Sequence, residues 1–201
     1  MHPTAAFRET DQDRLAGLIA RTGLAVIIGV EDGRPRTAHA PVLFSDHRLR
    51  FHLARANALT STLSAAGWAL AVVTGPNAYV SPDWYGAEDQ APTWAYLSAE
   101  IEGAVRVLDQ ADATRLLDDL SAAFESRLAP KPPWDRSKMS AGRFEAMLGA
   151  ITAFEMTVER LEGVRKLSQN KSARAQGQLA NALFERGGEN AVALGRLIMK
   201  G

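Results

Sequence analysis

The sequence contains no cysteine among its 201 residues. Disulfides, thiolate nucleophiles, cysteine-ligated zinc and iron–sulfur clusters are therefore excluded. No apolar run approaches the roughly 18 residues of a membrane-spanning helix, and the first residues lack the cationic and apolar pattern of a signal peptide. We therefore expect a soluble, cytoplasmic protein that does not enter a membrane.

The sequence also lacks an excess of either charge, with 23 Lys and Arg residues against 23 Asp and Glu residues. DNA-binding proteins usually carry a basic excess, because contacts to phosphates supply most of their non-specific affinity. There is no Ser/His/Asp order, glycine-rich phosphate loop or paired-carboxylate pattern either. The composition therefore counts against specific DNA binding, and no catalytic residue is predicted.

Helices are predicted where apolar residues recur at helical spacing. With 46% hydrophobic residues, a chain of this length can bury a substantial core, and we expect one domain over 1–201. Gly187 and Gly188 separate the last two predicted helices. The predicted helices cover 11–22, 60–66, 111–128 and 140–151, with two more within about 172–199.

Strands are predicted where apolar residues alternate with polar ones or form short dense runs. The clearest alternation places Leu97, Ala99 and Ile101 on one face of a strand. The predicted strands are 24–30, 36–44, 49–54, 68–74, 94–108 and one that starts at 154 and ends near 161. Six or more strands, with helices inserted at about 110–151 and appended at about 172–199, indicate a mainly β barrel of the α+β class.

Two histidines fall on the hairpin formed by 36–44 and 49–54. Paired residues on the two strands sum to either 91 or 93, so His52 opposes His39 or Pro41, and both imidazoles share one face of the sheet in either register. No carboxylate or third histidine lies at ligand spacing, and zinc usually needs three or four protein ligands. We predict no metal site. Polar packing at a barrel rim and a ligand site remain the alternatives.

Arg55 and Asn57 follow the third predicted strand directly. Asn57 is a favourable cap for the helix over 60–66. The N-terminus of a helix carries partial positive charge and free N–H groups, and Arg55 adds a cation with paired donors, a combination suited to a phosphate. An ordinary capped surface helix beside a surface arginine is the alternative interpretation.

Aromatic residues are concentrated between positions 79 and 96. Tyr and Trp combine a large apolar ring with a polar tip, which suits them to stacking on a flat ligand. Closing a barrel end or filling a dimer contact is the alternative role for each of them. The candidate stacking or substrate residues of this stretch are Tyr79, Ser81, Trp84, Tyr85, Trp94 and Tyr96.

A donor-rich segment follows the strand that is predicted to end near Leu161. It offers no apolar face to bury and is too rich in donors to be an ordinary turn. A solvated, flexible loop is the alternative to a binding segment. Its members are Lys166, Ser168, Gln169, Asn170 and Lys171.

These segments together resemble the PaiB-type family, described as FMN-binding negative transcriptional regulators with an FMN-binding split β-barrel. The resemblance extends from about Phe7 to about Leu183. It departs from the family at Ala58 and Leu59, where related chains tend to have Pro after the Asn, and at Ala95, where they tend to have Asn. Transfer of individual contacts is weakened at those three positions.

The resemblance implies FMN as cofactor and a homodimer in which the flavin lies along a strand pair and the 166–170 loop reaches the partner's cofactor. The strand-borne contacts would come from the segments His39–Leu43 and His52–Asn57, and the 166–170 loop would add further contacts. The implied cofactor-binding residues are His39, Pro41, Val42, Leu43, His52, Leu53, Arg55, Asn57, Lys166, Ser168, Gln169 and Asn170.

Three functions are compatible with this pattern, because a fold does not by itself determine function. The first is a flavin-binding regulator, and the second is an FMN-dependent oxidoreductase acting on a small molecule. The third is a barrel that binds haem, with His39 or His52 as axial ligand. The last predicted helix is apolar almost throughout and offers DNA only Arg196 and Lys200, so we expect it to pack rather than to recognise bases.

Overall fold

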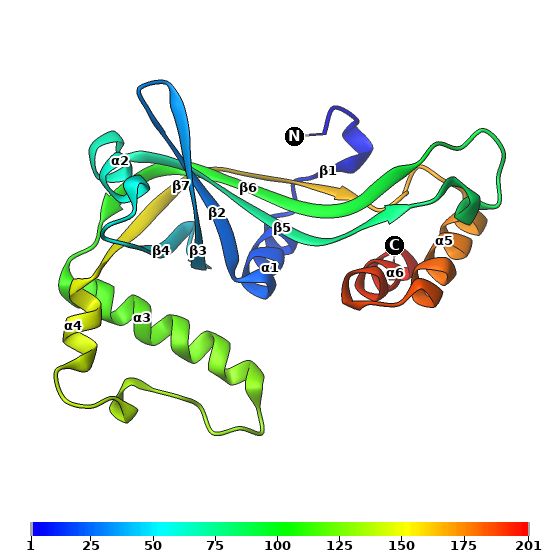
Figure 1. Ribbon diagram of the computed structural model, residues 1–201. Helices are drawn as coiled ribbons and strands as arrows, with labels where there is room; N and C mark the ends of the chain where they lie inside the picture. Colours follow the sequence, from blue (N-terminus) through cyan, green and yellow to red (C-terminus); the bar gives the residue numbers. More distant parts are fainter. Residues whose placement is uncertain (1, 201) are drawn as a thin grey trace. The chain divides into compact units, whose positions relative to one another are not determined.

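The computed structural model describes residues 2–200 (Figure 1). No helix in this range is long and apolar enough to cross a membrane. The helices are α1 (Gln12–Thr22), α2 (Ala58–Ala66), α3 (Gln110–Glu125), α4 (Arg143–Gly149), α5 (Ala173–Arg186) and α6 (Glu189–Lys200). The strands are β1 (Arg8–Glu9), β2 (Leu24–Glu31), β3 (Arg34–Ser45), β4 (Arg48–Ala54), β5 (Trp68–Val80), β6 (Thr93–Val107) and β7 (Ile151–Lys166).

The strands form one sheet in the order β1-β7-β4-β3-β2-β5-β6, and a further pairing between β7 and β6 closes it. The registered pairs β1–β7, β2–β3, β2–β5, β3–β4 and β4–β7 are all antiparallel. Closure satisfies the backbone groups that an open sheet would leave at its edges. The predicted class, a mainly β barrel of α+β type with added helices, is confirmed.

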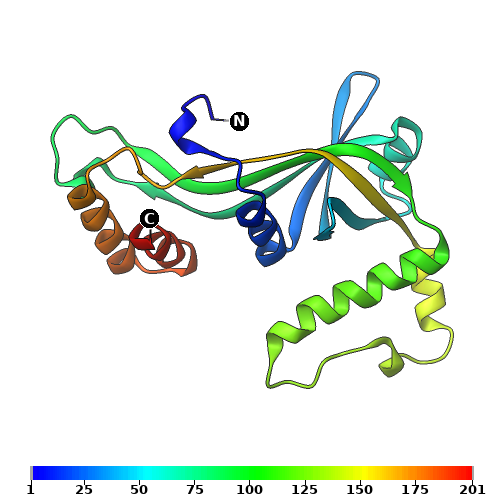
Figure 2. The same cartoon turned by 180° about the vertical axis from the view of Figure 1, so that it is seen from behind.

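The chain divides into two compact units. The barrel unit consists of Ile19–Val72 and Glu100–Arg160, and the terminal unit consists of the described residues of Met1–Leu18, Val73–Ala99 and Leu161–Gly201. Strands β5, β6 and β7 contribute residues to both (Figure 2). Each unit is described separately below.

The interior of the barrel unit is filled by alternate side chains of its strands. Phe51 of β4 and Phe154 of β7 stack at 5.4 Å between ring centroids, and both are fully buried. Ile27 and Ile101 are also fully buried. At Gly103 the strands approach so closely that a Cβ atom would lie 1.9 Å from the carbonyl oxygen of Thr157. A side chain is therefore excluded where β6 meets β7.

The outward face of β2 and β5 is also apolar. Leu24 and Val30 on β2 are 50% and 54% exposed, and Trp68 on β5 is 41% exposed. The pair Val26–Val72 joins the two strands on this same outward side, and both residues are half-buried. A dense apolar run is typical of strands that are covered on both faces. The barrel unit therefore presents an apolar sheet surface to its exterior.

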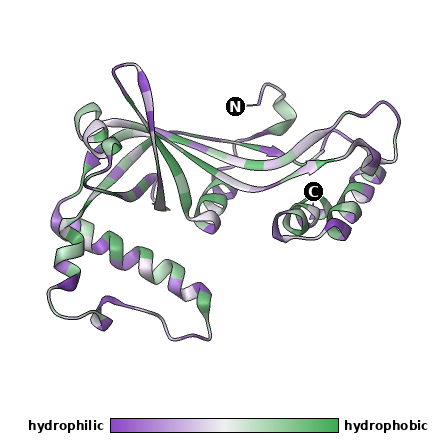
Figure 3. Ribbon diagram, viewed as in Figure 1, coloured by the Kyte–Doolittle hydropathy of each residue, from purple (hydrophilic) through white to green (hydrophobic). Residues whose placement is uncertain are grey.

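Helices α3 and α4 lie between β6 and β7 in the sequence and pack on the barrel through a cluster built on Leu116, Leu120 and Leu148. Figure 3 shows hydrophobic and hydrophilic residues in alternating bands along α3, the pattern of a helix with one buried face. Arg50 of β4 pairs with Asp119 of α3 at 3.0 Å. Apolar and ionic contacts thus fix this helical insertion to the barrel.

In the terminal unit, α5 and α6 pack side by side (Figures 1 and 2). Helix α6 buries Leu194 and Ile198, and Gly195 lets the ring of Phe184 approach closely. Helix α6 therefore has one buried face, through which it packs on α5. The prediction that the last helix is a packing element is confirmed.

Two strands run well past the ends predicted from the sequence. Strand β5 continues through Gly75 and Pro76 to Val80 instead of ending near residue 74. Its pairing with β2 stops at Val72, so Pro76 lies where no N–H is needed on that side. Strand β7 runs to Lys166 rather than ending near Leu161, so Lys166 belongs to a strand and not to a loop.

Candidate functional site

The segment that joins β4 to α2 holds Arg55 and Asn57 in defined positions. The Asn57 side chain accepts a hydrogen bond from the N–H of Leu59 at 2.9 Å, which confirms the predicted helix cap. The Asn57 N–H donates to the Ala54 carbonyl oxygen at 2.9 Å, and so does the hydroxyl of Thr60. These bonds hold the chain in one conformation where the helix begins.

Arg55 is fixed at both its backbone and its side chain. Its N–H donates to the Ala150 carbonyl oxygen at 2.8 Å, and its guanidinium donates to the Ile151 carbonyl oxygen at 3.2 Å. A guanidinium carries five N–H groups, and the Arg55 side chain is exposed, so further donors face solvent. An oriented arginine beside a helix N-terminus suits a phosphate.

A cavity of about 410 Å³ opens beside Arg55. Its lining includes the carboxylates Asp109 and Glu145, together with Ser64. Two carboxylates oppose an anion by charge repulsion. The lining of this cavity is therefore unfavourable for a phosphate.

The β3–β4 hairpin adopts the register in which paired residues sum to 93, as in Val42–Phe51 and Leu43–Arg50. His52 thus opposes Pro41 and not His39. His39 is exposed, whereas Pro41 and His52 are half-buried on the same outward face. His39 and His52 thus lie on the outward face that the family resemblance implies for the flavin. They do not form a directly opposed pair.

Three of the predicted cofactor-binding residues have side chains committed elsewhere. Val42 and Leu53 point into the barrel and are almost fully buried. Leu43 packs on the α3–α4 cluster. The buried side chains of Val42 and Leu53 cannot meet a ligand outside the barrel, whereas Leu43 lies on the outward face of β3 with His39 and Pro41.

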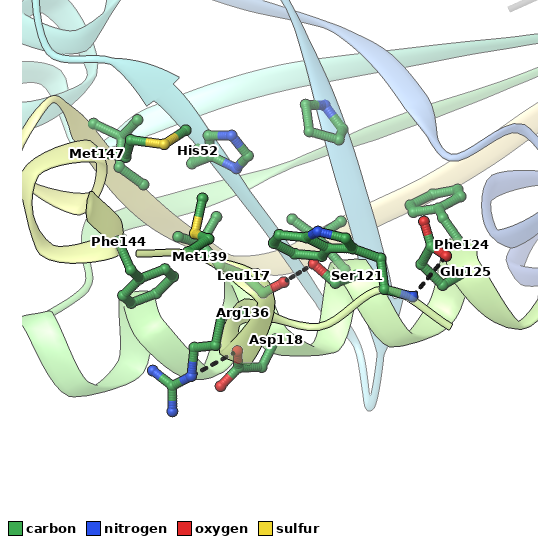
Figure 4. A pocket seen from close by; sticks show the side chains of 14 residues that line it. His52, Leu117, Asp118, Ser121, Phe124, Glu125, Arg136, Met139, Phe144 and Met147 are labelled. Carbon is green, nitrogen blue, oxygen red and sulfur yellow. Dashed lines mark hydrogen bonds and ion pairs between the residues drawn. The ribbon is translucent and has the colours of Figure 1, made fainter. Parts of the chain in front are cut away.

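His52 lines a second cavity, of about 380 Å³, between the barrel and the helical insertion (Figure 4). Within residues 2–200, His52 Nδ1 is a buried side-chain nitrogen without a hydrogen-bond partner. Burial lowers the pKa of His52, so its imidazole is neutral at neutral pH. The wall is otherwise mainly apolar: Pro41, Leu117, Leu120, Phe124, Trp134, Met139, Phe144, Met147 and Ile151.

Sequence reasoning included Pro41 and His52 but missed the wall supplied by the insertion. The helical spacing of Leu117 and Phe124 indicates only that they belong to a helix. Trp134, which follows Pro130, Pro132 and Pro133, was the one available signal, since a tryptophan in a loop needs a surface to cover it.

The donor-rich segment that begins at Lys166, the last residue of β7, forms hydrogen bonds within its own unit. The Lys166 ammonium donates to the Thr93 hydroxyl at 2.8 Å, and the hydroxyls of Ser168 and Tyr85 share a hydrogen bond of 2.8 Å. Gln169 donates to the Ala6 carbonyl oxygen at 2.8 Å. The segment does bury apolar surface, contrary to expectation, since Leu167 is only 2% exposed. Of the predicted residues here, Asn170 is exposed.

The predicted aromatic residues divide by exposure. Tyr79 and Trp94 are 41% and 53% exposed and meet edge to face at 6.4 Å. Ser81, Trp84 and Tyr96 are half-buried. Tyr85 is enclosed, with its hydroxyl bonded to Ser168 and the Lys171 ammonium over its ring at 5.3 Å. Its predicted role in stacking on a ligand does not fit this burial.

The predicted residues therefore fall into two sets, one in each unit. The barrel unit holds the set from His39 to Asn57, and the terminal unit holds the aromatic residues and the set from Lys166 to Asn170. No three His, Asp or Glu side chains within residues 2–200 come together in a way that could bind a metal ion.

The fold and these segments place the chain in a known class. It belongs to the family described as "Putative FMN-binding domain", which matches residues 1–160. The Bacillus subtilis "Protease synthase and sporulation protein PAI 2" is 28% identical over 170 residues, covering 83% of this chain and 81% of that protein. The resemblance to the PaiB type is thus confirmed: the chain is a PaiB-like FMN-binding protein, with FMN as its cofactor.

Two solved structures share the fold. The FAD and heme binding protein from Mycobacterium smegmatis superposes with a TM-score of 0.61 at 20% identity, covering 90% of this chain and 80% of that one. The flavocytochrome Anf3 from Azotobacter vinelandii gives a TM-score of 0.61 at 13% identity, covering 82% of this chain and 72% of that one. Both likenesses concern the fold alone.

Proposed function

We propose that FMN binds to the barrel unit with its phosphate at Arg55 and the start of α2, and with its ring along the outward face of β3 near His39. The observation that carries this is the orientation of Arg55 by two backbone carbonyl oxygens beside a helix capped by Asn57. Bound FMN supplies redox or light-absorbing chemistry, and the protein supplies position and charge.

The protein acts as a homodimer in this proposal. The exposed apolar face of β2 and β5, with Leu24, Val30 and Trp68, is a surface that a second copy would cover. A twofold arrangement pairs the same patch with itself and creates two equivalent pockets.

The terminal unit of one protomer completes the pocket of its partner. Exposed Tyr79 and Trp94 supply aromatic surface, and exposed Asn170 supplies an amide. Hydrogen bonds from Lys166, Ser168 and Gln169 to residues outside the segment support this role, because a pre-ordered segment loses little conformational entropy on binding.

A mixed dimer tests this arrangement. Chains carrying Arg55→Ala are combined with chains carrying Asn170→Ala, and the heterodimer is isolated through two affinity tags. One of its two pockets then has both intact residues, so half a molar equivalent of FMN per chain should bind with wild-type affinity in a fluorescence titration. Each mutant homodimer should lack such sites. A heterodimer without a wild-type site would place Asn170 in its own protomer's pocket, and wild-type affinity in the Asn170→Ala homodimer would place it in neither pocket.

We propose that the protein is an FMN-binding regulator in the cytoplasm and that it does not itself bind specific DNA sequences. The regulator role rests on the PaiB family description alone. The balanced charge and the buried apolar face of α6 support an indirect effect. The comparisons do not favour a separate oxidoreductase function.

Direct DNA binding is expected to be weak and independent of sequence. An anisotropy titration with duplex DNA at about 0.15 M salt, with and without FMN, should give no sequence-dependent complex, and residual binding should fall steeply with added salt. Sequence-dependent binding tighter than about 1 μM would instead establish a direct repressor.

A further inference from the structure

We infer that the cavity beside His52 is a binding site, separate from that of the flavin, for a neutral and largely apolar aromatic molecule with one hydrogen-bonding group. This inference rests on the proposed function only in taking the flavin to lie outside the cavity. The volume of the cavity, about 380 Å³, falls within the roughly 300–1,000 Å³ of small-molecule pockets.

The wall determines the chemical class of the ligand. Figure 4 shows Met139, Met147, Phe144 and Phe124 around the cavity, with His52 on the strand side. Thioether and aromatic groups are polarizable and make favourable contacts with flat rings. A planar aromatic ligand matches such a wall better than a sugar or a peptide, which would leave many polar groups unbonded.

His52 supplies the polar contact. Its Nδ1 is buried without a hydrogen-bond partner within residues 2–200, so a ligand in the cavity meets the imidazole at its other ring nitrogen. The Ser121 hydroxyl, in contrast, already donates to the Leu117 carbonyl oxygen at 2.9 Å. Because the imidazole is neutral, it can either accept from or donate to one ligand group.

The charged residues of the wall are already paired. Arg136 pairs with Asp118 at 3.4 Å, and Glu125 accepts from the Trp134 N–H at 2.9 Å and pairs with Lys131. Arg136 is the one cation among the lining residues. An anionic ligand would find no free positive charge there, and the two carboxylates of haem would lack partners, so a neutral ligand is favoured.

The experiment titrates FMN-free protein with 2-naphthol, naphthalene and 2-naphthoate at pH 7.5. Tryptophan fluorescence reports binding, because Trp134 lines the cavity and is one of four tryptophans. 2-Naphthol should bind with one site per chain, and the anionic 2-naphthoate should bind at least about 10-fold more weakly. Trp134→Phe should remove most of the quenching, and saturating FMN should leave the 2-naphthol affinity unchanged.

His52→Phe should weaken 2-naphthol by about 2- to 12-fold, the range for one hydrogen bond, and should leave naphthalene unaffected. His2→Phe removes an imidazole from the terminal unit and is the matched control; it should change neither affinity. Displacement of 2-naphthol by FMN would assign the cavity to the flavin ring and overturn the inference. Absence of 2-naphthol binding, or equal affinity for the naphthoate, would overturn it too, whereas a failure of FMN itself to bind would contradict only the proposed function.

Discussion

Replacing Arg55 with alanine is expected to weaken FMN binding by about 10- to 150-fold, which corresponds to roughly 1.5–3 kcal/mol for a hydrogen bond to a charged group. The effect should be confined to ligands with a phosphate, because the proposed partner of Arg55 is the phosphate and not the flavin ring. Riboflavin should bind to the wild-type and variant proteins with nearly equal affinity. Titration of both ligands by flavin fluorescence measures the difference.

Arg36→Ala is the matched control for this prediction. Arg36 is an exposed arginine of β3 that pairs with Glu31 at 3.2 Å. Its removal should leave FMN affinity unchanged within about twofold, since exposed ion pairs contribute little. An equal loss of FMN and riboflavin affinity in the Arg55 variant would contradict the phosphate assignment.

Gly103→Ala is expected to destabilise the fold by about 3 kcal/mol or more, at or above the upper end for overpacking a core. The added Cβ would meet the Thr157 carbonyl oxygen at 1.9 Å, and a backbone atom cannot rotate away as a side chain can. Strands β6 and β7 would have to separate where they close the barrel. Urea denaturation followed by circular dichroism gives the change in the free energy of unfolding.

Gly177→Ala provides the opposite control. Gly177 lies within α5, and no atom lies within 4 Å of the position that its Cβ would occupy. Alanine should therefore stabilise the protein by about 0.5–1 kcal/mol, because it favours the helix over the unfolded chain. Equal stability of the Gly103→Ala and Gly177→Ala variants would contradict the close approach of β6 and β7 at Gly103.

Local chemistry made part of this structure predictable from the sequence. Asn57 was identified as a helix cap because its hydrogen bond reaches only two residues along the chain. The alternation around Ile101 correctly indicated a barrel strand. Gly75 and Pro76 were misleading, because both are usual in turns and only the pairing of β5 with its neighbours decides whether the strand continues.

The features of the candidate site that escaped prediction all depend on distant parts of the chain. The environment of His52 is created by Phe124 and Met147, which lie far along the sequence and whose spacing shows only that they belong to helices. The donors of Ser168 and Lys166 looked available because Tyr85 and Thr93 could not be placed beside them. Sequence patterns show which groups are present, whereas tertiary contacts decide which of them are already used.

The pairing of β4 with β7 has a consequence for how the protein is made. Arg48 pairs with Thr157, so the ribosome must synthesise roughly a hundred further residues before β4 meets this neighbour. Until then the nascent chain holds an incomplete barrel whose unpaired strand edges are open to other chains. We therefore expect barrel closure to follow translation of β7, and chaperones that bind exposed strands would act in that interval.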